Sequence, residues 1–166
     1  DSPVKSVKEL IAQAKATPGK LNFGSNNIGT TQHLSTELLK SMAAIDVTAV
    51  PFNNTAGVLT ALRGGSVQVA FEFLPPVIGK IKAGGLRAIA VTSRTRFALL
   101  PDVPTLAESG VPGYEVTSWN GIAVAAKTPK TIIDRLNREI HAAVNSPQIK
   151  QRFQDLGVEQ NTRTPE

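Results

Sequence analysis

The sequence predicts an α/β protein with a parallel or mixed sheet flanked by helices. Between residues 6 and 93, short apolar segments typical of strands alternate with amphipathic segments typical of helices, which is the pattern of βαβ units. Residues 67–73 (VQVAFEF) alternate apolar and polar side chains, as a half-buried strand does. Residues 86–93 (LRAIAVTS) are nearly all apolar, as in a strand covered on both faces. A chain of 166 residues is long enough to bury a sizeable core.

The pattern opens with a helix, a strand and a second helix. The motif SVKE at 6–9 fits a capping box and predicts a helix to about Ala16, which TPGK stops. LNFGS at 21–25 predicts a short strand, and the helix after it is expected to end near Ala44. One face of that helix is expected to carry Leu34, Leu38 and Met42.

A second strand and helix follow. VTAVPF at 47–52 predicts the strand, and the next helix is expected to be capped by Asn53 or Asn54 and ended by the glycine pair 64–65. After the strand at 67–73, two prolines are expected to open a helix that runs through Lys82.

The composition changes after residue 98. Residues 99–116 (LLPDVPTLAESGVPGYEV) are rich in proline and glycine and indicate a long ordered connection rather than a core element. TSWNGIAVAA at 117–126 predicts a strand in which Trp119 is expected to be a packing anchor.

Two helices are expected in the last part of the chain. Thr128 is the expected N-cap of the first, with Pro129 at its first helical position, and Ser146-Pro147 repeats this start signal for a helix that ends at Gly157. The first of these helices carries an apolar stripe made of Ile132, Leu136, Ile140 and Val144, widened by Ile133 and Ala143.

Composition and charge exclude several classes of protein. The chain has no cysteine, so disulfides, thiolate metal sites and a cysteine nucleophile are excluded. It has no apolar run of about 18 residues that would span a bilayer. The net charge of +5 favours anionic partners, but the basic residues are scattered and are not interleaved with aromatic ones, so nucleic acid is not an expected partner.

The sequence lacks the usual signatures of catalysis. Neither His33 nor His141 has a partner at metal-ligand spacing, and Ser25 does not lie in the G-x-S-x-G turn of a serine nucleophile. We therefore expect a binding protein that is not an enzyme and has no metal or cofactor.

The segment 24–34 (GSNNIGTTQHL) is the candidate binding loop. Gly24 and Gly29 have the spacing of a phosphate-binding P-loop, but two threonines replace its Lys and Ser/Thr, which argues against nucleotide hydrolysis. A helix N-terminus binds carboxylate or phosphate through main-chain N–H groups without a cation. The alternative is a helix that is merely well capped. The candidate ligand-binding residues here are Ser25, Asn26, Asn27, Gly29, Thr30, Thr31, Gln32 and His33.

Two further candidates lie at the ends of predicted strands. Glu72 is expected at the carboxyl edge of a parallel sheet, where open α/β sheets bind ligands. There it would contact a ligand amine or hydroxyl or order a water; the alternative is a solvated carboxylate. Phe52, at the end of another strand, is either a pocket wall or a core residue.

Three stretches together resemble one family: 6–43, 47–93 and 99–140, with LPDVPTLAESGVPGYE and TSW the most specific motifs. They are similar to the extracytoplasmic solute receptors of the tripartite tricarboxylate transporter family, also called Bug-type receptors. This resemblance implies a periplasmic, two-lobed binding protein of type II that closes on a small carboxylate and delivers it to membrane permease subunits. It also implies that main-chain amides, small hydroxyl side chains and ordered waters hold the ligand, and that 24–33 is the binding loop of the second lobe.

The chain departs from the family pattern in two motifs and in length. It has PFNN at 51–54 where members often have PYKG, and FEF at 71–73 where they often have FDN, which puts the identity of the ligand in doubt. Members are about twice as long, so 1–112 is expected to be the second lobe, and 113–166 a crossover strand and helices of an incomplete first lobe.

Two consequences stay open at this point. The apolar stripe at 132–144 is expected to fold onto the second lobe, to be exchanged with another copy, or to form a dimer interface. The same architecture also serves as the ligand-sensing module of transcription regulators, and an enzyme acting on a carboxylate is a third alternative. A signal peptide in the full gene would favour the receptor, and a helix-turn-helix the regulator.

Overall fold

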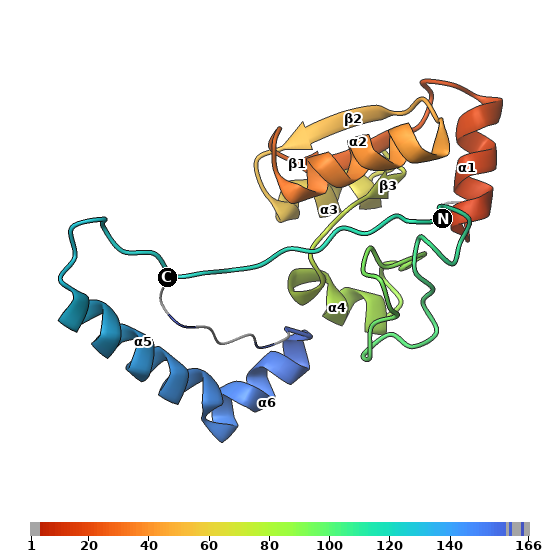
Figure 1. Ribbon diagram of the computed structural model, residues 1–166. Helices are drawn as coiled ribbons and strands as arrows, with labels where there is room; N and C mark the ends of the chain where they lie inside the picture. The colour runs from red at the N-terminus through yellow and green to blue at the C-terminus, as the bar shows by residue number, and fades with distance from the viewer. Residues whose placement is uncertain (1–3, 159, 161–163, 165–166) are drawn as a thin grey trace. The chain divides into compact units, whose positions relative to one another are not determined.

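The computed structural model describes residues 4–158, 160 and 164. The chain divides into two compact units, Asp1–Ser118 and Trp119–Glu166. The first unit contains the sheet and helices α1 to α4, and the second contains α5 and α6 (Figure 1). The assignment of 1–112 and 113–166 to two different lobes stays a prediction.

The sheet of the first unit is parallel, as predicted. Strands β1 (Asn22–Asn26), β2 (Thr48–Phe52) and β3 (Val69–Ala70) are arranged in the order β2-β1-β3. Gly24 in the central strand is aligned with Val50 on one side and with Ala70 on the other. The chain therefore leaves β1 toward one edge of the sheet and later returns across it to the opposite edge.

Helices α2 (Thr31–Ala43) and α3 (Thr55–Arg63) cover opposite faces of this sheet (Figure 1). A Cβ atom added to Gly24 would lie 3.2 Å from Val58 of α3, whereas Phe23, on the other face of β1, belongs to the same core cluster as Leu39 of α2. This arrangement follows from the strand order, because two right-handed crossovers that run in opposite directions place their helices on opposite faces.

The main core lies on the α2 face of the sheet. The α1 helix (Val7–Ala16) contributes Val7, Leu10 and Ala14 to it, and its aromatic centre is a row of three rings. The ring centroids of Phe23 and Phe71 are 6.5 Å apart, and those of Phe71 and Tyr114 are 6.4 Å apart in a stacked arrangement.

The predicted caps are confirmed where local chemistry decides them. The Ser6 hydroxyl accepts a hydrogen bond from the Glu9 N–H group at 3.2 Å, and the Asn54 side chain accepts one from Gly57 at 2.9 Å. Helix α4 (Leu74–Lys82) begins at the two prolines and ends where expected.

The long connection at 99–116 belongs to the core, which corrects the prediction. It has no regular helix or strand, but Leu106, Val111 and Tyr114 are buried in the main cluster. The Tyr114 hydroxyl donates a 2.8 Å hydrogen bond to the main-chain oxygen of Ser35 in α2. Burial raises the pKa of Tyr114 to about 12, so this hydroxyl keeps its proton. Turn residues prevented a regular element here, but they did not prevent the apolar side chains between them from packing.

Two strand predictions are wrong: the strand predicted at 67–73 is shorter, and the segment 86–93 is not a strand. Strand β3 covers two residues of the predicted 67–73 and pairs with β1 alone. Residues 86–93 form no strand; Val91 makes an isolated parallel bridge with Thr105. A strand requires a neighbouring backbone at hydrogen-bonding distance along its length, and here the backbone pairing with residues 104–116 is confined to Val91 and Thr92.

The expected apolar face of α2 is confirmed only at Leu38, which is partly buried against the main core. Leu34 is 56% exposed, and Met42 is exposed as well. The residues of α2 that are buried are Gln32, Ser35, Thr36 and Leu39. The helix therefore turns a largely polar face toward β1. The reason is that β1 places the buried side chain of Ser25 on the face that α2 covers, and polar side chains of the helix are better neighbours for it than leucines.

The second unit differs from its predicted form at its beginning. Residues 117–126 form no strand, and Trp119 is 85% exposed instead of acting as a packing anchor. Helix α5 (Lys130–Asn145) has Pro129, not Thr128, as its N-cap. Within the described part of this unit no other strand is present to pair with 117–126, so the segment stays without regular structure.

The two helices of the second unit bury no residue among those described. Helix α6 (Pro147–Leu156) starts at Pro147 and ends at Gly157, as predicted. Ile132 and Leu136 of the stripe on α5 remain exposed. The three expected fates of this stripe stay predictions.

Candidate functional site

The candidate site lies at the carboxyl edge of the sheet, in the first unit. The connection after β1 leads through α2 to β2, on one side of the central strand. The connection that leads into α4 starts from β3, on the other side of that strand. Such a switch point is where open α/β sheets bind ligands, because the diverging connections leave a crevice. The N-terminus of α3 follows β2 at the same edge, so three helix N-termini are directed toward it.

The N-terminus of α2 presents free main-chain donors. Thr30 caps the helix: its hydroxyl donates to the Asn27 oxygen at 2.8 Å and accepts from the His33 N–H group at 3.4 Å. The N–H groups of Thr31 and Gln32 make no hydrogen bond with other described residues. Gly29 has φ of +87° in the preceding loop, a conformation that favours glycine. The loop therefore places two free N–H groups at the positive end of the helix dipole.

Buried polar atoms without hydrogen-bond partners in the described chain occur in the strand and the helix that flank this loop. Ser25 is 0% exposed, and its hydroxyl oxygen forms no hydrogen bond within the described residues. It lies on the same face of β1 as Phe23, the face covered by α2. Asn26 Oδ1 and His33 Nδ1 are also buried and unpartnered within the described chain. Leaving a buried polar group unpaired costs about 1–3 kcal/mol, so these atoms indicate a site that takes up a ligand or water.

Glu72 joins the same cluster from the connection after β3. Its Oε2 atom accepts a 3.0 Å hydrogen bond from the Thr55 hydroxyl in the first turn of α3. Its Oε1 atom is buried and has no hydrogen-bond partner of normal geometry among the described residues. Burial raises the pKa of Glu72, although the Thr55 hydroxyl, the Gln32 side chain and the main chain at Phe73 act to lower it.

The structure brings together most of the candidate residues. Nine of the candidates lie at the carboxyl edge of the sheet. They are Ser25 and Asn26 at the end of β1, Glu72 after β3, and six residues of the loop and the first turn of α2: Asn27, Gly29, Thr30, Thr31, Gln32 and His33. Phe52 is different: atoms of its ring lie 3.6 Å from a Cβ built on Gly24 and 3.4 Å from one built on Gly57, on the α3 face. It packs over two glycines.

Thr55 is the functional candidate that the sequence analysis missed. It follows the cap residue Asn54 and occupies the first helical position after β2, as Thr31 does after β1. This repeated placement of a threonine at the start of a helix was the available signal. Its pairing with Glu72 joins residues 17 apart in the sequence and required the tertiary structure.

Replacing Glu72 with glutamine is expected to stabilise the free protein at neutral pH. The folded pKa of Glu72 is raised, so its contribution to stability is fully present below its usual value of 4.5 and is lost as pH rises through the folded pKa. Thermal denaturation at pH 7 is expected to show a higher Tm for Glu72→Gln, by about 2–4 °C for each kcal/mol gained. The difference is expected to shrink as the pH approaches 4.5.

The control for this experiment is Glu37→Gln, which removes a carboxylate from the exposed side of α2, where Glu37 pairs with Lys40 at 3.0 Å. Surface pairs of this kind contribute little, so its Tm is expected to change little across the same pH range. A Tm for Glu72→Gln that is equal to or below that of the parent at pH 7 would contradict the electrostatic account of Glu72.

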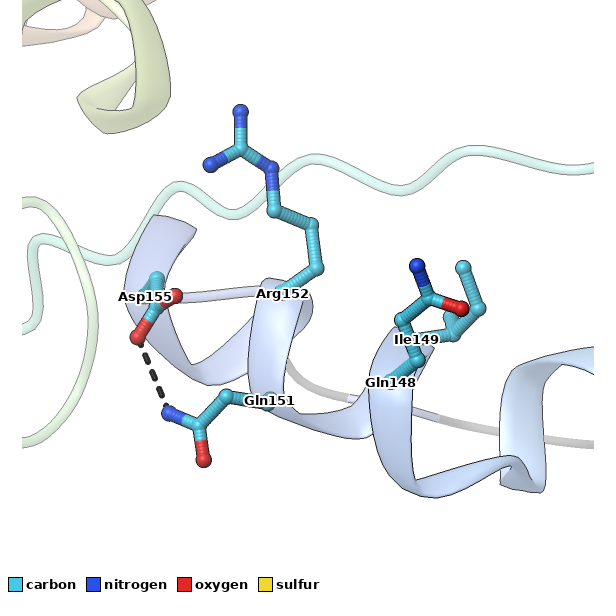
Figure 2. Close-up of a pocket in the computed structure, with 5 residues that line it drawn as sticks. All are labelled: Gln148, Ile149, Gln151, Arg152 and Asp155. Atoms are coloured by element: carbon cyan, nitrogen blue, oxygen red, sulfur yellow. Dashed lines mark hydrogen bonds between the residues drawn. The ribbon is translucent and has the colours of Figure 1, made fainter.

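A hollow of about 480 Å³ on α6 does not have the features of a site. Figure 2 shows its lining, in which the amide of Gln151 donates to Asp155 at 3.0 Å while Arg152 points away from this pair. All its lining residues come from one helix: Gln148, Ile149, Gln151, Arg152 and Asp155. With Ile149 half-buried and the others exposed, no buried polar group points into it.

The described ranges contain neither a metal-binding cluster nor a membrane-spanning helix. Among residues 4–158, 160 and 164, no three His, Cys, Asp or Glu side chains lie close enough together to hold a metal ion. Every helix in the same ranges is too short or too polar to cross a bilayer.

The fold and the site define an α/β ligand-binding lobe of the periplasmic binding protein class, with its binding groups at a switch point of the sheet. The chain belongs to the tripartite tricarboxylate transporter receptor family, whose model matches residues 1–164. The family resemblance and the predicted fold class are thereby confirmed.

Curated relatives match over nearly the whole chain. A UPF0065 protein encoded in the tcbD-tcbE intergenic region of Pseudomonas sp. strain P51 is 34% identical and covers 100% of this chain and 50% of the relative. Protein BugT of Bordetella pertussis is also 34% identical, covering 97% of this chain and 49% of BugT. The chain thus spans about half the length of the curated relatives it matches.

Solved structures agree in fold. The protein Rpa4515 of R. palustris, determined with adipate, matches with a TM-score of 0.92 and 37% identity over 98% of this chain and 54% of its own. The periplasmic binding protein BugD matches with a TM-score of 0.87 and 31% identity, over 95% and 52% of the two chains. MatC of Rhodopseudomonas palustris, with bound malate, matches with a TM-score of 0.84 and 29% identity, over 95% and 53%.

Proposed function

We propose that the protein containing this chain is an extracytoplasmic receptor that captures a small carboxylate for a tripartite tricarboxylate-type transporter. In this proposal residues 1–112 are the second ligand-binding lobe, and 113–166 return toward the first. The observation that carries the proposal is the Ser25 hydroxyl, which is fully buried on the α2 face of β1 and has no hydrogen-bond partner within the described residues. Family membership and the adipate and malate bound by two similar proteins support the same ligand class.

The chemistry of the site suits reversible capture. A ligand carboxylate would accept hydrogen bonds from the free N–H groups of Thr31 and Gln32, with the Ser25 hydroxyl as a further donor. All three donors are neutral, and no Lys or Arg side chain pairs with Glu72 within the described residues. A site without a fixed cation binds anions through dipoles, which favours release as well as capture. Closure of two lobes over the ligand would then provide the signal for the transporter.

The proposal includes location and partners. The similar proteins are receptors and periplasmic binding proteins, so we place this protein in the periplasm, with membrane permease subunits as its partners and no catalytic role. A carboxylate held by amides and a hydroxyl is bound without being activated, because no nucleophile and base of the described chain are hydrogen-bonded to each other at this edge.

Calorimetric titration with small organic acids tests the proposal. Adipate, malate and succinate are the ligands, succinamide is the uncharged control, and both the 166-residue chain and the complete gene product containing it are measured. The acids are expected to bind the complete product at least about tenfold more tightly than the chain, a difference of about 1.4 kcal/mol, because a second lobe adds contacts. Equal binding of succinamide, or no binding of any acid to the complete product, would refute carboxylate capture.

A further inference from the structure

We propose that Glu72 makes this site selective for carboxylates that also carry a hydrogen-bond donor, an ammonium or a hydroxyl group. The inference rests on the proposed function and names the ligand class within it. Its physical basis is one buried oxygen atom of a half-buried carboxylate, to which no described residue donates a hydrogen bond of normal geometry.

The two oxygens of Glu72 have different surroundings. Oε2 accepts a hydrogen bond from the Thr55 hydroxyl at 3.0 Å, which holds the carboxylate at the start of α3. Oε1 is buried and has no partner within the described part of the chain. An ionised carboxylate only accepts hydrogen bonds, so whatever completes Oε1 must be a donor.

The neighbouring groups of the chain leave this position to a ligand. The Gln32 side chain and the Phe73 main chain are neutral hydrogen-bond donors that act to lower the pKa of the carboxylate, but neither reaches Oε1 with normal hydrogen-bond geometry. No lysine, arginine or histidine among the described residues forms an ion pair with it. Partial burial of a carboxylate without a cation carries a desolvation cost, and a ligand ammonium or hydroxyl would offset that cost when it binds.

Glu72 and the α2 donors impose two different requirements on one ligand. The N–H groups of Thr31 and Gln32 require an anionic acceptor, whereas Glu72 requires a donor. Gln32 belongs to both groups, because its main-chain N–H is free and its side chain acts on Glu72. The carboxylate and the donor group of the ligand must therefore be no farther apart than the main chain and the side-chain end of Gln32. Amino acids and hydroxy acids meet this condition.

A matched series of acids isolates this requirement. Succinate, malate and aspartate share a four-carbon dicarboxylate skeleton and differ at one carbon, which bears hydrogen, hydroxyl or ammonium. Calorimetry with the complete gene product is expected to give malate and aspartate at least about tenfold tighter binding than succinate, since the added group donates a hydrogen bond to a charged acceptor.

The Glu72→Gln variant distinguishes charge from hydrogen bonding. It is expected to reduce the advantage of aspartate over succinate about tenfold, while malate keeps part of its advantage because the amide oxygen still accepts from a hydroxyl. The matched control is Glu37→Gln on the exposed side of α2, which is expected to leave all three affinities unchanged.

The outcomes separate this inference from the proposed function. If succinate binds as tightly as malate and aspartate, both to the parent and to Glu72→Gln, donor selectivity is refuted while carboxylate capture stands, and Oε1 is satisfied by water. If none of the three acids binds and adipate fails as well, the proposed function is refuted, and this inference with it.

Discussion

Replacing Thr31 with proline is expected to weaken carboxylate binding about 10- to 100-fold while leaving helix α2 in place. The substitution deletes one main-chain N–H group, which is free of partners in the described chain. A hydrogen bond to a charged group is worth about 1.5–3 kcal/mol, which corresponds to this loss of affinity.

The backbone around Thr31 is compatible with proline. Thr31 is the first helical residue, where proline is tolerated because that N–H group has no partner in the helix. The residue before a proline must be extended, and Thr30 has φ of −71° and ψ of 161°. The Thr31 carbonyl, which accepts from the Ser35 hydroxyl at 2.7 Å, is retained.

The control is Thr31→Ala, which removes the hydroxyl and keeps the N–H group. Titration of succinate or malate into the complete gene product measures both variants, and circular dichroism verifies that the helical signal is preserved. The binding mechanism would be contradicted if Thr31→Pro, still helical, bound the acids as tightly as Thr31→Ala does.

Replacing Phe23 with alanine is expected to destabilise the first unit by about 3–5 kcal/mol. Phe23 is 0% exposed at the centre of the sheet, and its ring contacts Phe71 at the start of the aromatic row. The truncation removes apolar contacts and leaves a cavity between β1 and α2. At about 2–4 °C for each kcal/mol, Tm is expected to fall by about 6–20 °C.

Phe73→Ala is the matched control, because it makes the same chemical change at a side chain that is 41% exposed. The free energy of unfolding of both variants is measured by urea denaturation, with far-UV circular dichroism as the signal. If Phe23→Ala lost no more stability than Phe73→Ala, the placement of the core on the α2 face of the sheet would be wrong.

Elements governed by neighbouring residues were predictable from the sequence. The cap at Ser6, the cap at Asn54 and the proline start of α4 each involve groups within four residues of one another. Local hydrogen bonds and fixed proline geometry decide such boundaries whatever the rest of the chain does. The parallel order of strands and helices followed from the same short-range alternation.

Features that depend on a distant partner were not predictable in the same way. The hydrophobic pattern of α2 suggested a buried face with Leu34, but β1 presents Ser25 to this helix, so Gln32 and Thr36 are buried instead. Residues 86–93 have the composition of a strand and lack a neighbouring one. Trp119 has the size of an anchor but is 85% exposed, with its ring against the backbone of Gly121 rather than in a core.

The candidate site shows the same division. The loop after β1 was identified from its glycines and hydroxyls, because the start of a helix has free N–H groups wherever it occurs. The sequence by itself thus determined the order of elements, their caps and the anion-binding character of one loop. Only the tertiary structure decided that Thr55 and Gln32 meet at Glu72 and that one of its oxygens has no hydrogen-bond partner among the described residues. The physical reason is that burial and pairing depend on what packs against a side chain, and those partners come from other strands and helices.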